Sequence, residues 1–167
     1  MSDAQAAPAA EQAVVFNLQR VYLRDCSLEI PQAPQIFLDT SEPRLEFEID
    51  TTEQELGGDM VEVGVRCTIT CRVGDGVGFL VEATQAAIFE IQGVSAEQRT
   101  LLKGISCPNI VYPYLRSNIA DLIQRSSFPP VHLSEINWEG FFQQKLAKLA
   151  AQQAPAGASE SGLILPQ

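Results

Sequence analysis

Apolar and polar residues alternate along residues 61–73 more regularly than anywhere else in the chain. Every odd position from Val61 to Val73 is apolar, whereas the even positions from Glu62 to Arg72 are mostly polar. A period of two places successive side chains on opposite faces, which predicts a long β-strand with one buried face. The same alternation over residues 44–50 and 77–91 predicts two further strands.

Residues 14–23 are also rich in β-forming residues, but apolar side chains occupy both odd and even positions. This pattern predicts a strand that is covered on both faces or is kinked, and a subunit interface would explain either. Gly57-Gly58 predicts a turn before the strand at 61–73. Asp75-Gly76 predicts a tight turn between that strand and the one at 77–91.

The second half of the chain changes to a helical period. Ser95–Gln98 reads as a capping box that starts a short helix, and Gly104 suits the C-terminal end of that helix. A second helix is predicted over 110–126, with Pro113 in its first turn or at a kink, before Pro129-Pro130. Its apolar stripe consists of Val111, Leu115, Ile119, Leu122 and Ile123.

A last helix is predicted over residues 138–152. Its apolar side consists of Trp138, Phe141, Phe142, Leu146 and Leu149. Strands followed by helices indicate an α+β fold, with a four-stranded antiparallel sheet and helices packed on one face. Residues 13–152 form the predicted single domain, and the Ala-, Gln-, Pro-, Ser- and Gly-rich segments 1–12 and 153–167 are predicted to be disordered tails.

The net charge of −10 changes the picture of possible partners. Residues 1–55 hold 11 acidic and 3 basic side chains, so most of the negative charge lies in the first third of the chain. An acidic surface repels nucleic acid and anionic membranes and favours a basic protein partner. The charge is equally compatible with a simple role in solubility.

The chain shows no sign of a membrane segment or a secretion signal. No apolar run approaches the ~20 residues needed to span a bilayer. The segment MSDAQAAPAAEQ has no basic stretch followed by an apolar one, so it does not resemble a signal peptide. We therefore expect a cytoplasmic protein that does not insert into membranes.

Candidate chemistry is sparse. Cys26, Cys67, Cys71 and Cys107 form no C-x-x-C pair, which predicts buried free thiols and neither a metal site nor a cofactor. GDGVG at 74–78 runs into a strand and not a helix, so it predicts a hairpin and not a phosphate-binding loop. The single histidine, His132, has no recognised catalytic context, although an enzyme that used it with a thiol remains the alternative class.

Three segments, in this order, carry a family resemblance. They are FNLQRVYLRDCSLEIPQAP at 16–34, FLVEATQAAIFEI at 79–91, and CPNIVYPYLRSNIADLIQRSSFPPVHLSEINWEGFF at 107–142. The last contains a CPN…PY entry into a helix, an R-x-x-FPP exit and an IN-aromatic start to the last helix. Over roughly residues 14–150 the chain resembles the SecB family of protein-export chaperones.

The resemblance implies a function and an assembly. SecB-like proteins are bacterial cytoplasmic, ATP-independent holdases that bind unfolded precursor proteins and deliver them to the SecA ATPase. They assemble as homotetramers, dimers of dimers whose long helices are sandwiched between sheets. The alternative within the same fold is a SecB-like chaperone dedicated to a toxin–antitoxin system.

The resemblance also implies two sites. Asp25, Glu29, Leu80 and Glu82 match the SecA-binding face of the family, and Leu80 lies on the polar side of its strand. Leu45, Phe47, Ile49 and Trp138 match the groove that binds client peptides, although periodicity alone would place these four in the core. Trp138 stands where the family usually has Phe, and Ser41 where it often has Trp. Both departures alter the aromatic lining expected for the groove.

Overall fold

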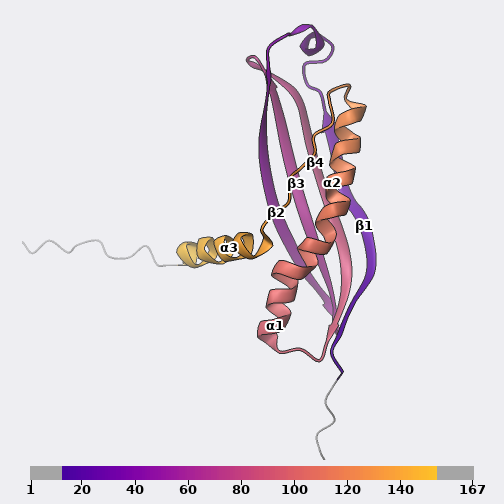
Figure 1. Ribbon diagram of the computed structural model, residues 1–167, viewed down its shortest axis with the longest axis vertical. Coiled ribbons are helices and arrows are strands. Elements are labelled where there is room, and N and C mark those ends of the chain that lie inside the picture. The colour runs from indigo at the N-terminus through magenta and orange to yellow at the C-terminus, as the bar shows by residue number, and fades with distance from the viewer. Residues whose placement is uncertain (1–12, 154–167) are drawn as a thin grey trace, which may run out of the picture.

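The computed structural model describes residues 13–153 and has the predicted α+β architecture (Figure 1). The strands are β1 (Val15–Glu29), β2 (Pro43–Gly57), β3 (Met60–Val73) and β4 (Gly76–Gln92). The helices are α1 (Ala96–Leu101), α2 (Cys107–Arg125) and α3 (Trp138–Gln153), with a π-helical turn η2 (Leu102–Ser106) between α1 and α2 and a short 3-10 helix η1 (Gln35–Leu38) between β1 and β2. All strand pairs are antiparallel, and the order across the sheet is β1-β4-β3-β2.

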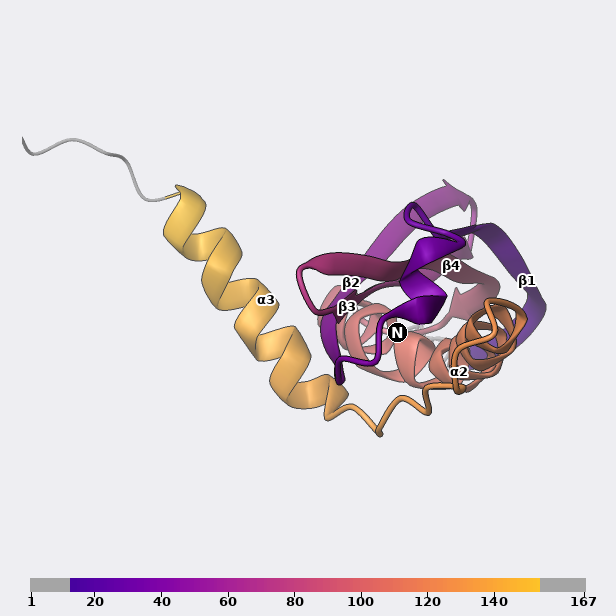
Figure 2. The same cartoon turned by 90° about the horizontal axis from the view of Figure 1, so that it is seen from above.

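Helix α2 lies along one face of the sheet, here called the inner face (Figures 1 and 2). It packs mainly over β4 and β3, the two central strands. The core between them contains the alternating apolar residues of β3 and β4 and the buried stripe Val111, Leu115, Ile119 and Ile123 of α2. The strict alternation of residues 61–73 is thus explained by a strand that is covered by a helix on one face only.

Two β-bulges explain the mixed pattern at the start of the chain. The register of β1 against β4 shifts between Leu18 and Arg20 and again between Leu23 and Asp25. Each extra residue exchanges the faces of the side chains that follow it, so apolar residues change parity although they stay on the inner face. The prediction of a kinked strand is therefore correct, and the strand extends beyond residue 23 to Glu29.

A third bulge lies at the β3–β4 hairpin. Val73 pairs with Gly76, so the turn consists of Gly74, which has φ +57°, and Asp75; the predicted Asp75-Gly76 turn was one residue too late. Gly78 then has no partner in the register of β3 against β4. As a result Val77 lies opposite Arg72, on the outer face. The prediction that Val77 is in phase with the core residues of β4 was wrong for this reason.

Strand β2 is twice as long as its hydrophobic pattern predicted. Beyond residue 50 its inner positions are Thr51, Glu53 and Glu55, which carry no apolar signal. These side chains bind cations from the helices instead: Glu53 and Glu55 pair with Lys103, and Glu55 also pairs with Arg99. Polar contacts therefore replace apolar packing over the second half of this strand.

Helices α1 and α2 form one continuous rod through η2, and this corrects the predicted end of the first helix. Ser95 does cap α1 through a capping box with Gln98. Gly104, however, lies inside the rod and does not end a helix. Of the two positions predicted for Pro113, the first turn is excluded, because Pro113 lies in the interior of α2. Gly104 instead makes room for Phe142 of α3, because a Cβ added there would lie 2.3 Å from the Phe142 ring.

Helix α3 leaves the body of the protein beyond β2 (Figures 1 and 2). Only its first five residues contribute to the core: Trp138 and Phe142 are buried, whereas Leu146 and Leu149 are exposed. The predicted continuous apolar side is thus split into a buried start and an open continuation. Gln153, assigned to a tail from sequence, closes α3, and the predicted tails at 1–12 and 154–167 lie outside the described residues.

Candidate functional site: two surfaces of one sheet

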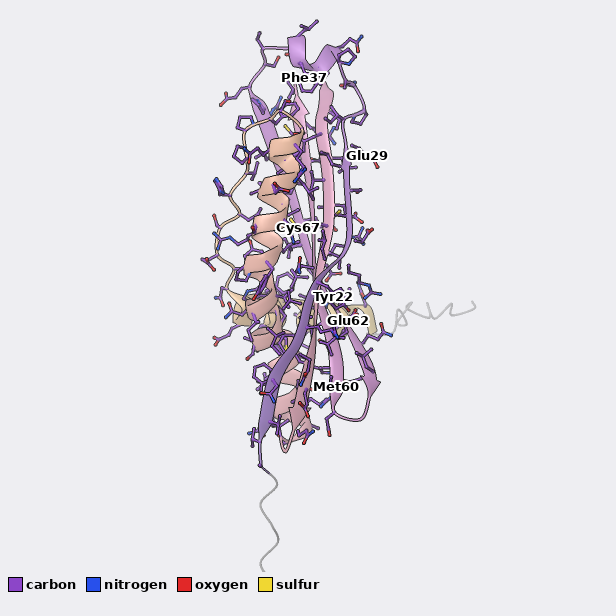
Figure 3. All side chains as sticks on the ribbon, turned by 90° about the vertical axis from the view of Figure 1, so that its right-hand side faces the viewer. Tyr22, Glu29, Phe37, Met60, Glu62 and Cys67 are labelled. Carbon is purple, nitrogen blue, oxygen red and sulfur yellow. The ribbon has the colours of Figure 1, made fainter. Side chains whose placement is uncertain are left out.

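The four residues matched to a partner-binding site come together on the outer face of the sheet, away from α2. Glu29 of β1 lies opposite Leu80 of β4, Ser27 opposite Glu82, and Asp25 opposite Thr84. Residues directly opposite in an antiparallel pair share a face, so Asp25, Glu29, Leu80 and Glu82 form one surface, here called the partner face. Glu29 lies on the side away from α2, as do Tyr22 and Glu62 (Figure 3).

The partner face contains one paired and two open carboxylates. Asp25 and Glu29 are exposed, and Leu80 is half-buried between them and β3. The Glu82 side chain is 30% exposed, and its Oε2 accepts hydrogen bonds from Arg66 Nη2 at 2.5 Å and from Thr68 Oγ1 at 3.3 Å. An apolar centre beside acidic groups suits a partner that brings basic side chains.

A polar cluster borders the partner face along the sheet. Glu62 of β3 accepts hydrogen bonds from the Tyr22 hydroxyl and from Arg24 Nη1, both on β1, so these side chains reach across β4 (Figure 3). Burial and the neighbouring Glu62 raise the pKa of Tyr22, which therefore stays a hydrogen-bond donor. This cluster joins two strands that are not neighbours and stiffens the outer face.

The residues matched to a client groove lie on the opposite face. Leu45, Phe47 and Ile49 of β2 pair with Cys71, Ile69 and Cys67 of β3, whose side chains are buried on the inner face. Because α2 covers the central strands and not β2, Phe47 remains 51% exposed and Leu45 37% exposed. These three residues form an open apolar surface, here called the client strip, at the edge of the sheet.

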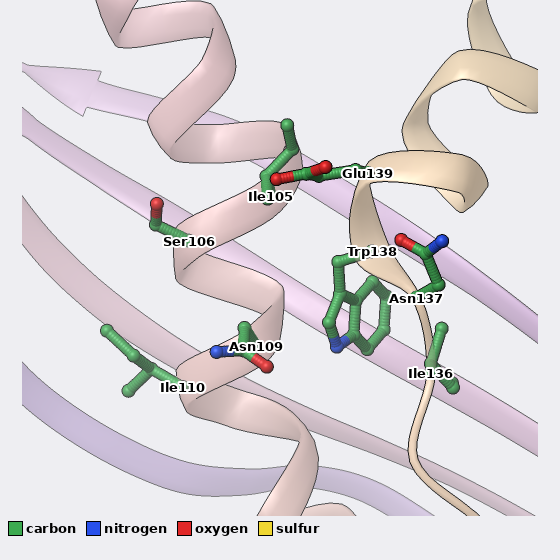
Figure 4. A pocket seen from close by; sticks show the side chains of 8 residues that line it. All are labelled: Ile105, Ser106, Asn109, Ile110, Ile136, Asn137, Trp138 and Glu139. Carbon is green, nitrogen blue, oxygen red and sulfur yellow. The ribbon is translucent and has the colours of Figure 1, made fainter.

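Trp138, the fourth residue matched to the groove, is 4% exposed and belongs to the buried core and not to the open client strip. Its ring packs against Tyr112 and Phe141, with centroids 5.4 and 5.5 Å apart. It also lines a hollow between the start of α2 and the start of α3, with Asn109 and Ile136 among its neighbours (Figure 4). Ile49 packs against the same core, which connects Trp138 to the strip.

Comparisons with known proteins match this arrangement. The family model described as "Preprotein translocase subunit SecB" matches residues 9–149. The chain belongs to the SecB family. Similar relatives include the protein-export protein SecB of Ralstonia pickettii, 49% identical over 99% of this chain and 96% of that protein. SecB of Janthinobacterium sp. is 50% identical over 90% of each chain.

The SecB fold is also found among solved structures. The SecB-like chaperone Rv1957 of Mycobacterium tuberculosis, in complex with a peptide from the HigA1 antitoxin, superposes with a TM-score of 0.60. The match covers 72% of this chain and 90% of that one at 17% sequence identity, so it supports the fold alone. The relatives near 50% identity are protein-export chaperones, and a toxin–antitoxin role is not favoured for this chain.

SecB proteins are chaperones and not enzymes, and the thiols of this chain agree with that class. Cys67, Cys71 and Cys107 are buried, and burial raises the pKa of Cys67 to about 11 and of Cys107 to about 12. Such thiols stay protonated and are poor nucleophiles. Cys26 differs from the prediction of buried thiols, because it is exposed on β1. Within residues 13–153, no helix is long and apolar enough to cross a membrane.

Arg66 and Thr68, which hold Glu82 on the partner face, were not among the predicted site residues. Both lie at even positions of the strand at 61–73, so the sequence pattern placed them on the correct, polar face. The pattern could not predict that they pair with Glu82, because the turn at 74–75 alone would set Cys67 opposite Glu82. The bulge at Gly78 shifts this register by one residue and places Thr68 there.

Proposed function

We propose that this chain is a cytoplasmic, ATP-independent holdase that keeps non-native precursor proteins competent for export and delivers them to SecA. The observation that carries the proposal is the division of one sheet into two exposed surfaces of different chemistry. The apolar client strip lies on the inner face, and the acidic partner face lies on the outer face. A client and a delivery partner can therefore occupy the same subunit at the same time.

The client strip is suited to extended, apolar segments. Phe47 and Leu45 offer apolar area, worth about 25 cal/mol per Å² buried, with little demand on client sequence. Strand β2 is also an edge of the sheet, so an extended client can add backbone hydrogen bonds along it. Binding the unfolded state lowers its free concentration and slows both folding and aggregation by mass action.

A homotetramer, built as a dimer of dimers, forms part of the proposal. One short strip binds weakly, but several strips on one assembly gain avidity for one long chain. The mixed pattern of residues 14–23, for which the sequence suggested an interface, is explained within the monomer by the bulges of β1, and the apolar stripe of α2 is buried on the monomer's own sheet. Support comes instead from exposed apolar residues beside α2: Leu18 and Leu23 on β1 are 42% and 41% exposed, and Tyr114 on α2 is 48% exposed.

Native mass spectrometry tests this proposal directly. We expect the purified chain to appear as a tetramer, and to gain one unfolded secretory precursor per tetramer when a reduced, unfolded precursor is added. The same precursor in its folded form serves as the control and is expected not to bind. A monomer that remains monomeric at micromolar concentration, or equal binding of both precursor forms, would contradict the proposed holdase.

Glu82→Lys separates the two surfaces. The substitution reverses one charge at the centre of the partner face and faces away from the client strip. We expect SecA binding to weaken at least about ten-fold, because a lysine there both removes an anchor and repels a basic partner. Affinity for an unfolded precursor should stay within about two-fold, and SecA binding by the unmodified chain should weaken as salt increases.

Ser27→Lys provides a second position for the same test, because Ser27 lies opposite Glu82 on the partner face. It adds one positive charge there without removing a carboxylate, so a smaller loss of SecA affinity is expected. Normal SecA binding by Glu82→Lys, or an equal loss of precursor binding, would show that the two-surface division is wrong.

A further inference from the structure

The central carboxylate of the partner face is already occupied by a cation of the chain itself. Arg66 Nη2 donates to Glu82 Oε2 at 2.5 Å, and the same oxygen accepts a hydrogen bond from Thr68. A basic side chain of a partner would need this oxygen or its neighbourhood. The Arg66 side chain is 51% exposed, so it is not locked in place by packing.

Arg66 has a second set of carboxylates on its other side. Asp50 of β2 lies directly opposite Arg66, and Glu48 lies opposite Thr68. Glu48, Asp50, Arg66 and Thr68 together line a small hollow on the outer face. The hydrogen bond to Glu82 is the largest cause that raises the pKa of Arg66, and the charges of Glu48 and Asp50 act in the same direction.

We propose that Arg66 is a resident counterion that competes with the basic side chains of SecA for Glu82 and moves toward Glu48 and Asp50 when SecA docks. This inference rests on the proposed SecA-binding face. In the free chaperone the ion pair keeps Glu82 satisfied and oriented. On docking, the guanidinium exchanges Glu82 for Glu48 and for Asp50, which it then shares with Lys145, whose Nζ lies 3.3 Å from Asp50 Oδ1, so the arginine charge stays paired.

The exchange has a consequence for selectivity. A partner must offer a cation that holds Glu82 better than Arg66 does, so isolated basic side chains on other proteins compete poorly for this position. Arg66 thus weakens every interaction at the partner face by a similar amount. Only a partner that also buries Leu80 and engages Asp25 or Glu29 recovers the loss.

Arg66→Gln tests this role against a matched control. The substitution frees Glu82, and we expect SecA to bind about two- to five-fold more tightly, as expected for loss of a competing surface ion pair. Arg72→Gln is the control: Arg72 lies on the same face of β3, is 49% exposed, and pairs with Glu46 at 3.0 Å. It makes the same change in net charge but leaves Glu82 paired.

Isothermal titration of purified SecA into each full-length variant, at one salt concentration, measures the effect. We expect Arg66→Gln to bind SecA at least about two-fold more tightly than Arg72→Gln does. We expect this gain in affinity to disappear in the Arg66→Gln, Glu82→Gln double variant. Equal affinities for the two arginine variants, weaker binding by Arg66→Gln, or a gain that persists without Glu82 would overturn the proposed competition. If Glu82→Gln alone leaves SecA binding unchanged, the proposed partner face itself fails, which is a separate result.

Discussion

Trp138→Ala is expected to lower the free energy of unfolding by about 3–5 kcal/mol, because truncating a buried tryptophan loses its burial and leaves a cavity. The side chain is 4% exposed and packs between the Tyr112 and Phe141 rings. Phe47→Ala, by contrast, removes a ring that is 51% exposed, and stability should fall by less than about 1 kcal/mol. Urea titrations of both variants measure the difference.

Phe47→Ala should weaken client binding more than Trp138→Ala does, once the loss of stability of each variant is taken into account. We expect Phe47→Ala to weaken binding of an unfolded precursor by about five-fold or more, since an exposed aromatic anchor is lost. Leu56→Ala is the control, because Leu56 is 44% exposed at the far end of the same strand. Equal losses for Phe47→Ala and Leu56→Ala would mean that the client strip has been misplaced.

Trp138 also supplies a signal for these measurements, as the chain has only one tryptophan. Its emission should change when an unfolded precursor binds, through movement of the α3 start beside the strip, and should not change with the folded precursor. Because the ring is buried, the signal reports a shift of its surroundings and not direct contact with the client.

Gly104→Ala is expected to displace α3 from the rest of the fold. A Cβ at this position would lie 2.3 Å from two carbons of the Phe142 ring, far inside van der Waals contact. Overpacking of this kind costs about 1–3 kcal/mol, which exceeds the gain of about 0.5–1 kcal/mol from replacing a helical glycine. Net destabilisation and a red-shifted Trp138 emission are therefore expected, since Trp138 lies one turn before Phe142 on the same side of α3.

Gly140→Ala is the matched substitution in α3 itself. The atoms nearest to a Cβ there belong to the Asn137 side chain, at 3.2–3.7 Å, and this exposed side chain, which accepts a hydrogen bond from the Gly140 N–H, needs to shift only slightly, so the helical gain should leave the variant close to the stability of the unmodified chain. Differential scanning fluorimetry and the emission maximum compare the two alanines. If Gly104→Ala were as stable as Gly140→Ala, with unchanged Trp138 emission, the close contact between Gly104 and Phe142 would not be what positions α3.

The parts of the fold that the sequence predicted are those with a strong single period. Residues 61–73 alternate because β3 is covered on one face by α2, and the capping box at Ser95 is a local hydrogen-bond pattern that needs no distant partner. The four residues of the partner face were predicted from the family resemblance, together with the position of Leu80 on the polar side of its strand. Its clustering in the structure depends on the pairing of β1 with β4.

The parts that could not be predicted depend on single residues that change register or on contacts distant in sequence. A bulge at Gly78 moves Val77 to the outer face. A glycine inside a strand often marks a bulge, but Val77 and Phe79 share the odd positions of the core residues, so the alternation showed no break at Gly78. The second half of β2 is stabilised by Lys103, Arg99 and Lys145 from helices that follow it by 40 residues or more. Gly104 reads as a helix end until Phe142 is placed against it.

The two outer strands of the sheet differ in how they resist self-aggregation. Both β1 and β2 are 15 residues long, and each has an edge without a neighbouring strand in residues 13–153. Long straight edges template fibril growth. Two bulges interrupt β1, so another strand cannot continue an unbroken ladder along it. Strand β2 is regular over most of its length, but it carries five carboxylates, four of them in ion pairs with β3 and the helices, and these charged side chains would crowd together if two copies paired along this edge. An edge that does not pair with a second copy of the chain, but can pair with an extended client, lets a chaperone hold aggregation-prone chains without joining their aggregates.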